Sequence, residues 1–118
     1  MYNWKNKKTE RLFKAFLSLE TVDEIAAFCR DLMTEPEINE FASRLEVASL
    51  LDEGKSQRQV SAESGVSIAT VTRVNQWLSR GMNGYKLVLN RLNADKSVIS
   101  KVFSSFAPTK KFSHHHPH

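Results

Sequence analysis

The stretch that decides the fold reads Gln57-Arg58-Gln59-Val60-Ser61-Ala62-Glu63-Ser64-Gly65-Val66-Ser67-Ile68-Ala69-Thr70-Val71-Thr72-Arg73-Val74. Two helical segments meet at Gly65, which can adopt the positive φ that a tight turn requires. Ser61 is small where the two helices approach each other, and Ser67 is a favourable N-cap for the second helix. The apolar contacts that lock the two helices at a steep angle come from Val60, Val66, Val71 and Val74. The pattern is typical of a helix-turn-helix over about Ser56 to Arg80.

The second helix of this motif offers a face suited to double-stranded DNA. Small side chains permit a close approach to the groove, and Thr hydroxyls and helix N-termini bind phosphates, whereas Arg and Gln side chains reach base edges. The predicted DNA-binding residues are Gln57, Arg58, Ser67, Ile68, Ala69, Thr70, Thr72 and Arg73. The alternative is a protein–protein interaction module, in which the same helical pair has a polar face but binds no nucleic acid.

Helical periodicity extends outward from the motif on both sides, and Val, Ile and Thr show no strand-like alternation. Apolar residues at helical spacing predict a first helix over about 9–19, a second that begins after Thr21, and a third that begins after Thr34 and ends at Gly54. Thr21 with Glu24 has the spacing of a reciprocal capping box, and the segment Thr34-Glu35-Pro36-Glu37 repeats it. After a turn at 81–84, a last helix carries Tyr85, Val88, Leu89 and Leu92. We therefore predict an all-α fold.

The length of 118 residues suits one domain of ordinary size. We place this domain at residues 1–93, with the motif at about 56–80, and a C-terminal extension at residues 94–118. The extension is expected to be partly disordered, because its end is rich in Lys and His after Pro108. One more helix could still form there from Val98, Ile99, Val102, Phe103 and Phe106.

The helices before residue 54 are short and carry wide stripes of Phe, Leu and Ile. A monomer of this size can bury such stripes only if the helices pack around one centre, and an exposed remainder usually marks an association surface. We therefore predict a homodimer.

Charge is distributed unevenly along the chain. The net charge is +4, but residues 15–53 contain two arginines and ten carboxylates, whereas residues 54–118 contain ten basic side chains and only Glu63 and Asp95 as acids. A basic half indicates a polyanionic partner, although a solvated charged surface explains the charge alone equally well.

Composition argues against several other classes of protein. No apolar run reaches the ~20 residues of a membrane span, and the first residues lack the apolar stretch of a signal peptide, so we expect a cytoplasmic protein without a membrane partner.

The single cysteine, Cys29, lies among apolar residues and is expected to be a small buried side chain. No catalytic or phosphate-binding signature is present, so we predict neither an enzyme nor a cofactor. The histidines at 114–116 and 118 could bind a divalent metal, but a flexible tail is the preferred interpretation and we predict no metal site.

Residues 21–80 resemble the Trp repressor superfamily, and more closely its YerC/YecD branch. The resemblance rests on Leu32-Met33-Thr34-Glu35-Pro36-Glu37, Ser43-Arg44-Leu45, Ser56-Gln57-Arg58-Gln59-Val60 and Ile68-Ala69-Thr70-Val71-Thr72-Arg73. It implies a Trp repressor-like helical bundle, assembled as an intertwined homodimer, that acts as a transcription regulator and most simply as a repressor. It also implies that Thr34, Arg44 and Arg73 correspond to the family's corepressor pocket, in which two arginines sandwich an indole ring.

The chain departs from the family pattern inside that pocket. Val74 stands where the family's pocket has a glycine, and Trp77 stands where it has a serine. These larger side chains should obstruct an indole ligand, so we interpret Thr34, Arg44, Arg73, Val74 and Trp77 as a vestigial ligand pocket. Free L-tryptophan is therefore not expected to be a corepressor. Without such a ligand, Arg44 and Arg73 could form ion pairs or contact phosphate.

Overall fold

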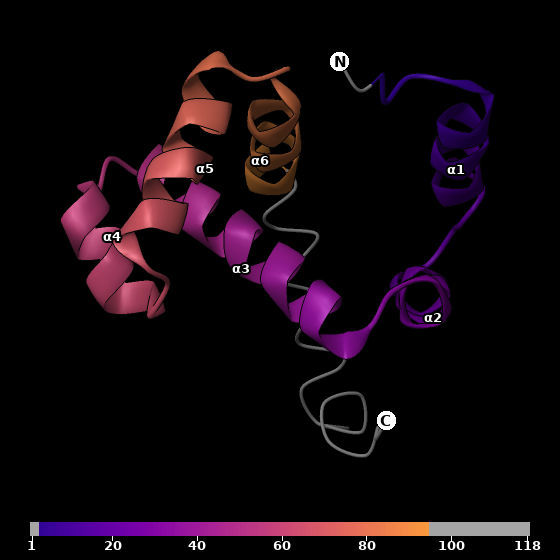
Figure 1. The fold of residues 1–118 in the computed structure, drawn as a ribbon, viewed down its shortest axis with the longest axis horizontal. Helices are drawn as coiled ribbons and strands as arrows, with labels where there is room; N and C mark the ends of the chain where they lie inside the picture. Colours follow the sequence, from indigo (N-terminus) through magenta and orange to yellow (C-terminus); the bar gives the residue numbers. More distant parts are fainter. Residues whose placement is uncertain (1–2, 95–118) are drawn as a thin grey trace. The chain divides into compact units, whose positions relative to one another are not determined.

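The computed structural model describes residues 3–94, and within that range the regular elements are helices joined by short connections (Figure 1). They are α1 (Lys7–Leu17), α2 (Val22–Leu32), α3 (Glu35–Asp52), α4 (Gln57–Ser64), α5 (Ile68–Arg80) and α6 (Gly84–Ala94). The described residues contain no strand, which confirms the predicted all-α class. The further helix considered for 98–106 and the histidines at 114–118 lie outside the described residues.

The described residues divide into two compact units, one that runs up to Ala42 and one that begins at Ser43, and α3 begins in the first and ends in the second. The prediction of one domain over 1–93 is not tested by this division and stays a prediction. The helix-turn-helix lies entirely within the second unit.

Side-chain caps explain where most of these helices begin. The Thr34 and Glu37 pair forms the reciprocal box predicted for α3, with Thr34 N–H donating to Glu37 Oε1 (2.9 Å) and Glu37 N–H donating to Thr34 Oγ1 (3.3 Å). The Thr34 N–H and the Thr34 hydroxyl (3.1 Å) both donate to the Glu37 carboxylate, and these two bonds lower the pKa of the Glu37 carboxyl group. At α2, Thr21 accepts from the Glu24 N–H as predicted, but the Glu24 carboxylate accepts from the Glu20 N–H (2.8 Å). The reciprocal box predicted for Thr21 and Glu24 is therefore wrong in its second half.

Helix α1 begins and ends two residues earlier than the predicted range of 9–19. Asn6 caps its start: Asn6 Oδ1 accepts from the Thr9 N–H (3.0 Å), and Thr9 Oγ1 accepts from the Asn6 N–H (2.9 Å). At the other end, the N–H of Ser18 bonds the carbonyls of Lys14 and Ala15, and the chain then leaves the helical path. The cap at Asn6 was missed because the reciprocal partner is a threonine rather than the usual Glu or Gln.

Two glycines with positive φ set the path of the chain into and through the motif. Gly54 (φ +97°) ends α3 as predicted, because the Gly54 N–H bonds Leu51 O (3.0 Å) and the Lys55 N–H reaches back to Leu50 O (3.4 Å). Gly65 (φ +76°, ψ +5°) caps α4 in the left-handed conformation that the sequence predicted. Its N–H donates to Ser61 O (3.0 Å), so α4 ends and the chain turns into α5.

The core of the second unit is small and made largely of valine. Helix α5 packs against both α4 and α6, and the carboxyl-terminal part of α3 supplies residues to the same cluster (Figure 1). The buried side chains are Val47, Ala48, Val60, Val71, Val74, Leu78 and Leu89, with Leu50, Leu51, Val66 and Tyr85 packed around them. The four valines predicted to lock the motif are thus all placed in or against its core.

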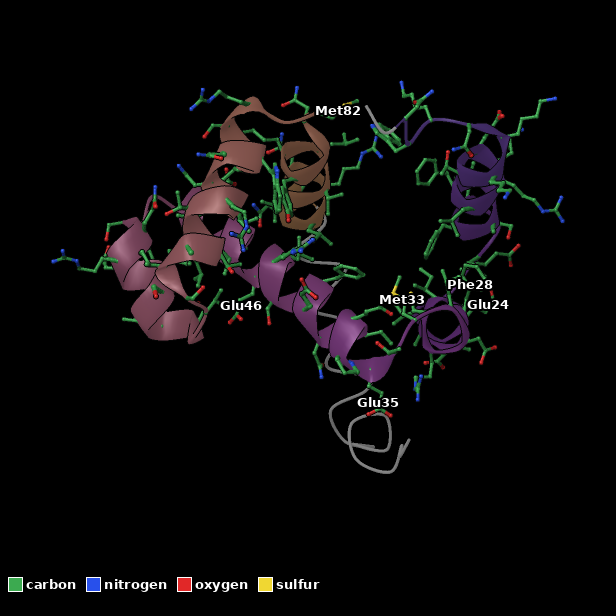
Figure 2. All side chains as sticks on the ribbon, viewed as in Figure 1. Glu24, Phe28, Met33, Glu35, Glu46 and Met82 are labelled. Carbon is green, nitrogen blue, oxygen red and sulfur yellow. The ribbon has the colours of Figure 1, made fainter. Side chains whose placement is uncertain are left out.

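The first unit has a different character, because no side chain of residues 3–42 is buried. Phe16 of α1 meets Phe28 of α2 edge to face, with ring centroids 5.2 Å apart, and Figure 2 shows Phe28 extending from α2 toward α1. Trp4 and Phe13 also meet edge to face, with their ring centroids 6.1 Å apart. Large apolar side chains in this unit nevertheless stay exposed, including Phe13, Leu17, Val22, Ile25 and Leu32. Cys29 is half-buried rather than buried, so the expectation of a buried cysteine is only partly met.

Replacing Gly65 with alanine should destabilise the protein by about 1–2 kcal/mol. No heavy atom lies within 4 Å of the position that the added Cβ would occupy, so the loss comes from the backbone conformation and not from a collision. Urea unfolding of Gly65→Ala and Gly65→Asn measures it. Asparagine tolerates the left-handed region, so Gly65→Asn should lose less stability; equal stability of Gly65→Ala and the parent would contradict the prediction.

Candidate nucleic-acid interface

The amino-terminal turn of α5 carries an exposed polar face. Ser67 caps the helix by accepting from the Thr70 N–H (3.3 Å), and the two hydroxyl oxygens lie 3.2 Å apart. Ile68 is half exposed and Ala69 is exposed beside it. This turn therefore offers short side chains, hydroxyls and a helix N-terminus to a partner, a combination suited to phosphates and to a groove.

Arg73 continues this face by one turn. Its Nη2 donates to Thr70 Oγ1 (3.2 Å), so Ser67, Thr70 and Arg73 form a hydrogen-bonded row along one side of α5. Arg73 is exposed, and its other donors can meet a ligand while Thr70 holds the guanidinium in place.

Gln57 and Thr72 join the two helices of the motif directly. Thr72 Oγ1 donates to Gln57 Oε1 (2.8 Å), and both side chains are half-buried. The bond holds the first turn of α4 to the middle of α5, so both residues have a structural role besides the DNA contact predicted for them. Sequence reasoning placed both at the interface but did not identify the bond, because partners fifteen residues apart in sequence are not revealed by helical spacing.

Charge at the motif is positive on balance. Arg58 is exposed on α4, as predicted for a residue that reaches outward. Glu63, the only acidic side chain between Ser56 and Arg80, pairs with Lys55 at 2.8 Å. This contact raises the pKa of the Lys55 ammonium group and offsets the negative charge of Glu63. Lys55 was not among the predicted site residues.

Within the second unit, two residues of the predicted vestigial pocket contact each other. Arg44 lies over the ring of Trp77, with its guanidinium carbon 5.3 Å from the ring centroid. Val74 is fully buried in the motif core and so lines no open space, and Arg73 bonds Thr70. Thr34 belongs to the first unit, where its hydroxyl lies 3.1 Å from Glu37 Oε1, and its assignment to the pocket stays a prediction.

Tyr85 of α6 is a neighbour of Arg44 that sequence reasoning missed. Burial raises the pKa of the Tyr85 hydroxyl, and the positive charge of Arg44 opposes that shift, which places the guanidinium within electrostatic reach of the phenol. The only signal in the sequence was the apolar face of the last helix, and that face does not reveal which residue of α3 it approaches.

Comparison with known proteins identifies the family. Residues 7–93 match the family described as Trp repressor protein. The chain belongs to the Trp repressor family. It is 39% identical to the uncharacterized protein YerC of Bacillus subtilis (strain 168) over 96 residues, which cover 81% of this chain and 92% of YerC. This agrees with the YerC branch that the sequence motifs indicated.

Solved structures support the same fold for this Trp repressor family member. A TrpR-like protein from Eubacterium eligens is 39% identical, with a TM-score of 0.72 over 75% of this chain and 92% of that chain. A candidate Trp repressor from Staphylococcus aureus is 36% identical, with a TM-score of 0.72 over 75% of this chain and 89% of that chain. The predicted Trp repressor-like all-α fold is thereby confirmed.

Membership also defines the class of activity. Proteins of the Trp repressor family are regulatory DNA-binding proteins and not enzymes, in agreement with the absence of a catalytic motif in the sequence. None of the helices within residues 3–94 combines the length and the apolar character needed to cross a membrane.

Proposed function

We propose that the protein is a sequence-specific transcription regulator, and most simply a repressor, that inserts the amino-terminal turn of α5 into the major groove of double-stranded DNA. The observation that carries the proposal is the hydrogen-bonded row of Ser67, Thr70 and Arg73, in which Ser67 and Arg73 are exposed and Thr70 is half-buried, on a helix held in the core by the fully buried Val71 and Val74. A DNA-binding regulator acts in the compartment that contains the genome. In bacteria, including the source of the relative YerC, that compartment is the cytoplasm.

The predicted contacts divide into two kinds. The Thr70 hydroxyl can donate to a phosphate oxygen, whereas Ser67 and Thr72 must exchange their hydrogen bonds to Thr70 and Gln57 for such a contact. Phosphate contacts set affinity and position without reading sequence. Arg58, Arg73 and Gln57 have the donors needed to read base edges, where a good bidentate contact is worth ~1–3 kcal/mol of discrimination. Ile68 and Ala69 permit close approach, and Ile68 can pack against a thymine methyl group.

We further propose that the protein acts as a homodimer. The exposed apolar residues of α1 and α2 support this. In a two-fold dimer the same apolar surface of a second copy can pack against them. Two-fold symmetry then places two copies of α5 about 34–36 Å apart and predicts a pseudo-palindromic site with half-sites one helical turn apart.

Selection of bound sequences from a random duplex pool tests the proposed function. We expect an enriched pseudo-palindrome, bound by a particle of twice the 13.5 kDa chain mass in light scattering. Affinity should fall steeply as salt rises, because Lys and Arg contacts release counterions from DNA. A chain that enriches no sequence and does not bind duplex DNA at low salt would favour the protein–protein interaction module instead.

Free L-tryptophan should leave operator affinity unchanged. The indole of Trp77 already covers Arg44, and Val74 is fully buried in the core, so an indole added over Arg44 would have to displace the Trp77 ring. Overpacking by even a few methylenes costs ~1–3 kcal/mol, and each 1.4 kcal/mol is about a tenfold loss of affinity. Calorimetry with millimolar tryptophan measures this. Saturable heat together with a tenfold gain in operator affinity would overturn the expectation and restore the corepressor mechanism.

A further inference from the structure

One contact in the second unit joins the candidate DNA-binding helix to a helix outside the motif. The Trp77 indole of α5 stacks on the Arg44 guanidinium of α3, and both groups are only partly buried: Trp77 is 41% exposed and Arg44 is half-buried. This is a cation–π interaction, in which the ring quadrupole attracts the positive charge, and tryptophan is the best aromatic partner for it.

The backbone that carries Trp77 is also fixed. The N–H of Gly81 donates to the carbonyl of Trp77 (2.9 Å), and a Cβ on Gly81 would collide with that carbonyl oxygen. The next residue, Leu78, is buried in the core. The last turns of α5 are therefore held by a core residue, a glycine turn and an aromatic ring on a cation.

We propose that Trp77 is a positioning residue for DNA recognition. Its stack on Arg44 fixes the orientation of α5, and this orientation determines how the exposed turn at Ile68 approaches a base edge. The inference rests on the proposed function of this face. Trp77 and Ile68 lie about two and a half turns apart, or about 14 Å along the helix axis. A small tilt at Trp77 therefore moves Ile68 and Ala69 across the groove, and contacts to base edges are more sensitive to such a shift than contacts to phosphates.

The pair Trp77→Phe and Trp77→Leu separates aromatic stacking from apolar packing, because phenylalanine keeps a ring face for Arg44 and leucine does not. Affinity is measured for a site enriched from the random pool and for a duplex of unrelated sequence. We expect Trp77→Phe to bind both like the parent. Trp77→Leu should bind the enriched site about tenfold more weakly, the size of effect expected when a partly desolvated cation–π contact is lost, and the unrelated duplex equally well. Gln76→Leu, at the exposed neighbouring position, is the matched control and should change neither affinity.

Arg44→Met provides a second route if Trp77→Leu proves unfolded by circular dichroism. It removes the cation and keeps a side chain of similar length, so it should cause the same selective loss. In a Trp4→Phe background, Trp77 is the remaining tryptophan, and Arg44→Met should increase quenching of its fluorescence by acrylamide without any DNA present.

The outcomes separate the two ideas. A parent chain that binds neither duplex overturns the proposed function itself. A parent that binds, with folded Trp77→Leu and Arg44→Met chains that bind like it, overturns only the positioning role. The positioning role also fails if both variants lose affinity equally for the enriched and the unrelated duplex, or if the quenching of Trp77 does not respond to Arg44→Met.

Discussion

Replacing Phe13 and Leu17 together with glutamine should convert a dimer into a monomer across the micromolar range. The two side chains lie one turn apart on α1 and are 52% and 84% exposed in the single chain. Within that chain the substitution removes the edge-to-face contact of Phe13 with Trp4 and little else that is buried. Burial of each side chain against a second copy contributes about 1.5–3 kcal/mol, and a two-fold interface contains each residue twice. The dimer should lose about 6 kcal/mol or more, equivalent to over four orders of magnitude in dissociation constant.

Sedimentation or light scattering at several concentrations measures this loss. Lys7→Gln with Arg11→Gln is the matched control, because these exposed residues have the same spacing on α1 and carry no apolar surface of comparable size. The control should remain a dimer. A Phe13→Gln, Leu17→Gln chain that stays dimeric would show that this part of α1 is not the association surface.

Ala69→Glu should reduce affinity for the enriched DNA site by more than about 100-fold while slightly raising the melting temperature. The new carboxylate would face phosphates and base edges, and like charges brought together at an interface cost several kcal/mol. The same carboxylate stands in the first turn of α5, where the helix dipole favours negative charge by about 0.3–1 kcal/mol. A loss of binding that accompanies a gain in stability cannot be attributed to unfolding.

The control for this prediction is Ala62→Glu, which makes the same substitution at an exposed alanine of α4 outside the predicted DNA-binding set. Both variants change the net charge equally, so long-range attraction to DNA weakens equally in both. Ala62→Glu should lose less than tenfold in affinity at moderate salt, because only long-range attraction is altered. If the two variants lose affinity to the same extent, the turn at Ile68 and Ala69 is not the face that meets DNA.

Local chemistry made much of the fold predictable. Gly54, Gly65, Ser67 and Thr34 act within a few residues of their own position, and each has the cap or turn role that its chemistry indicated. The valines of the motif were also identified in advance, since their spacing is fixed by the geometry of two crossing helices. The errors at α1 and at Glu24 are local as well, because several side chains near a helix start compete for the same free N–H groups.

Contacts between distant segments were less predictable. The sequence indicated that Trp77 would lie near the space beside Arg44, but the match of indole and guanidinium, with Tyr85 nearby, depends on how α3, α5 and α6 cross. The bond between Gln57 and Thr72 depends likewise on the crossing of α4 and α5. Periodicity shows which face of a helix is apolar, and it does not show which side chains meet across a crossing. The DNA-binding assignments themselves stay predictions for the experiments above.

The valine core of the motif has a consequence for the speed of association. Val47, Val60, Val71 and Val74 are the largest side chains that are fully buried within the described residues. Valine is stiff at χ1 and has no further torsion, so these side chains have few alternative packings and lose little conformational entropy on folding. A motif held in this way has one arrangement before it meets DNA, and binding then requires little additional ordering of the protein. Encounter should therefore be limited by diffusion and charge rather than by a rearrangement of the helices.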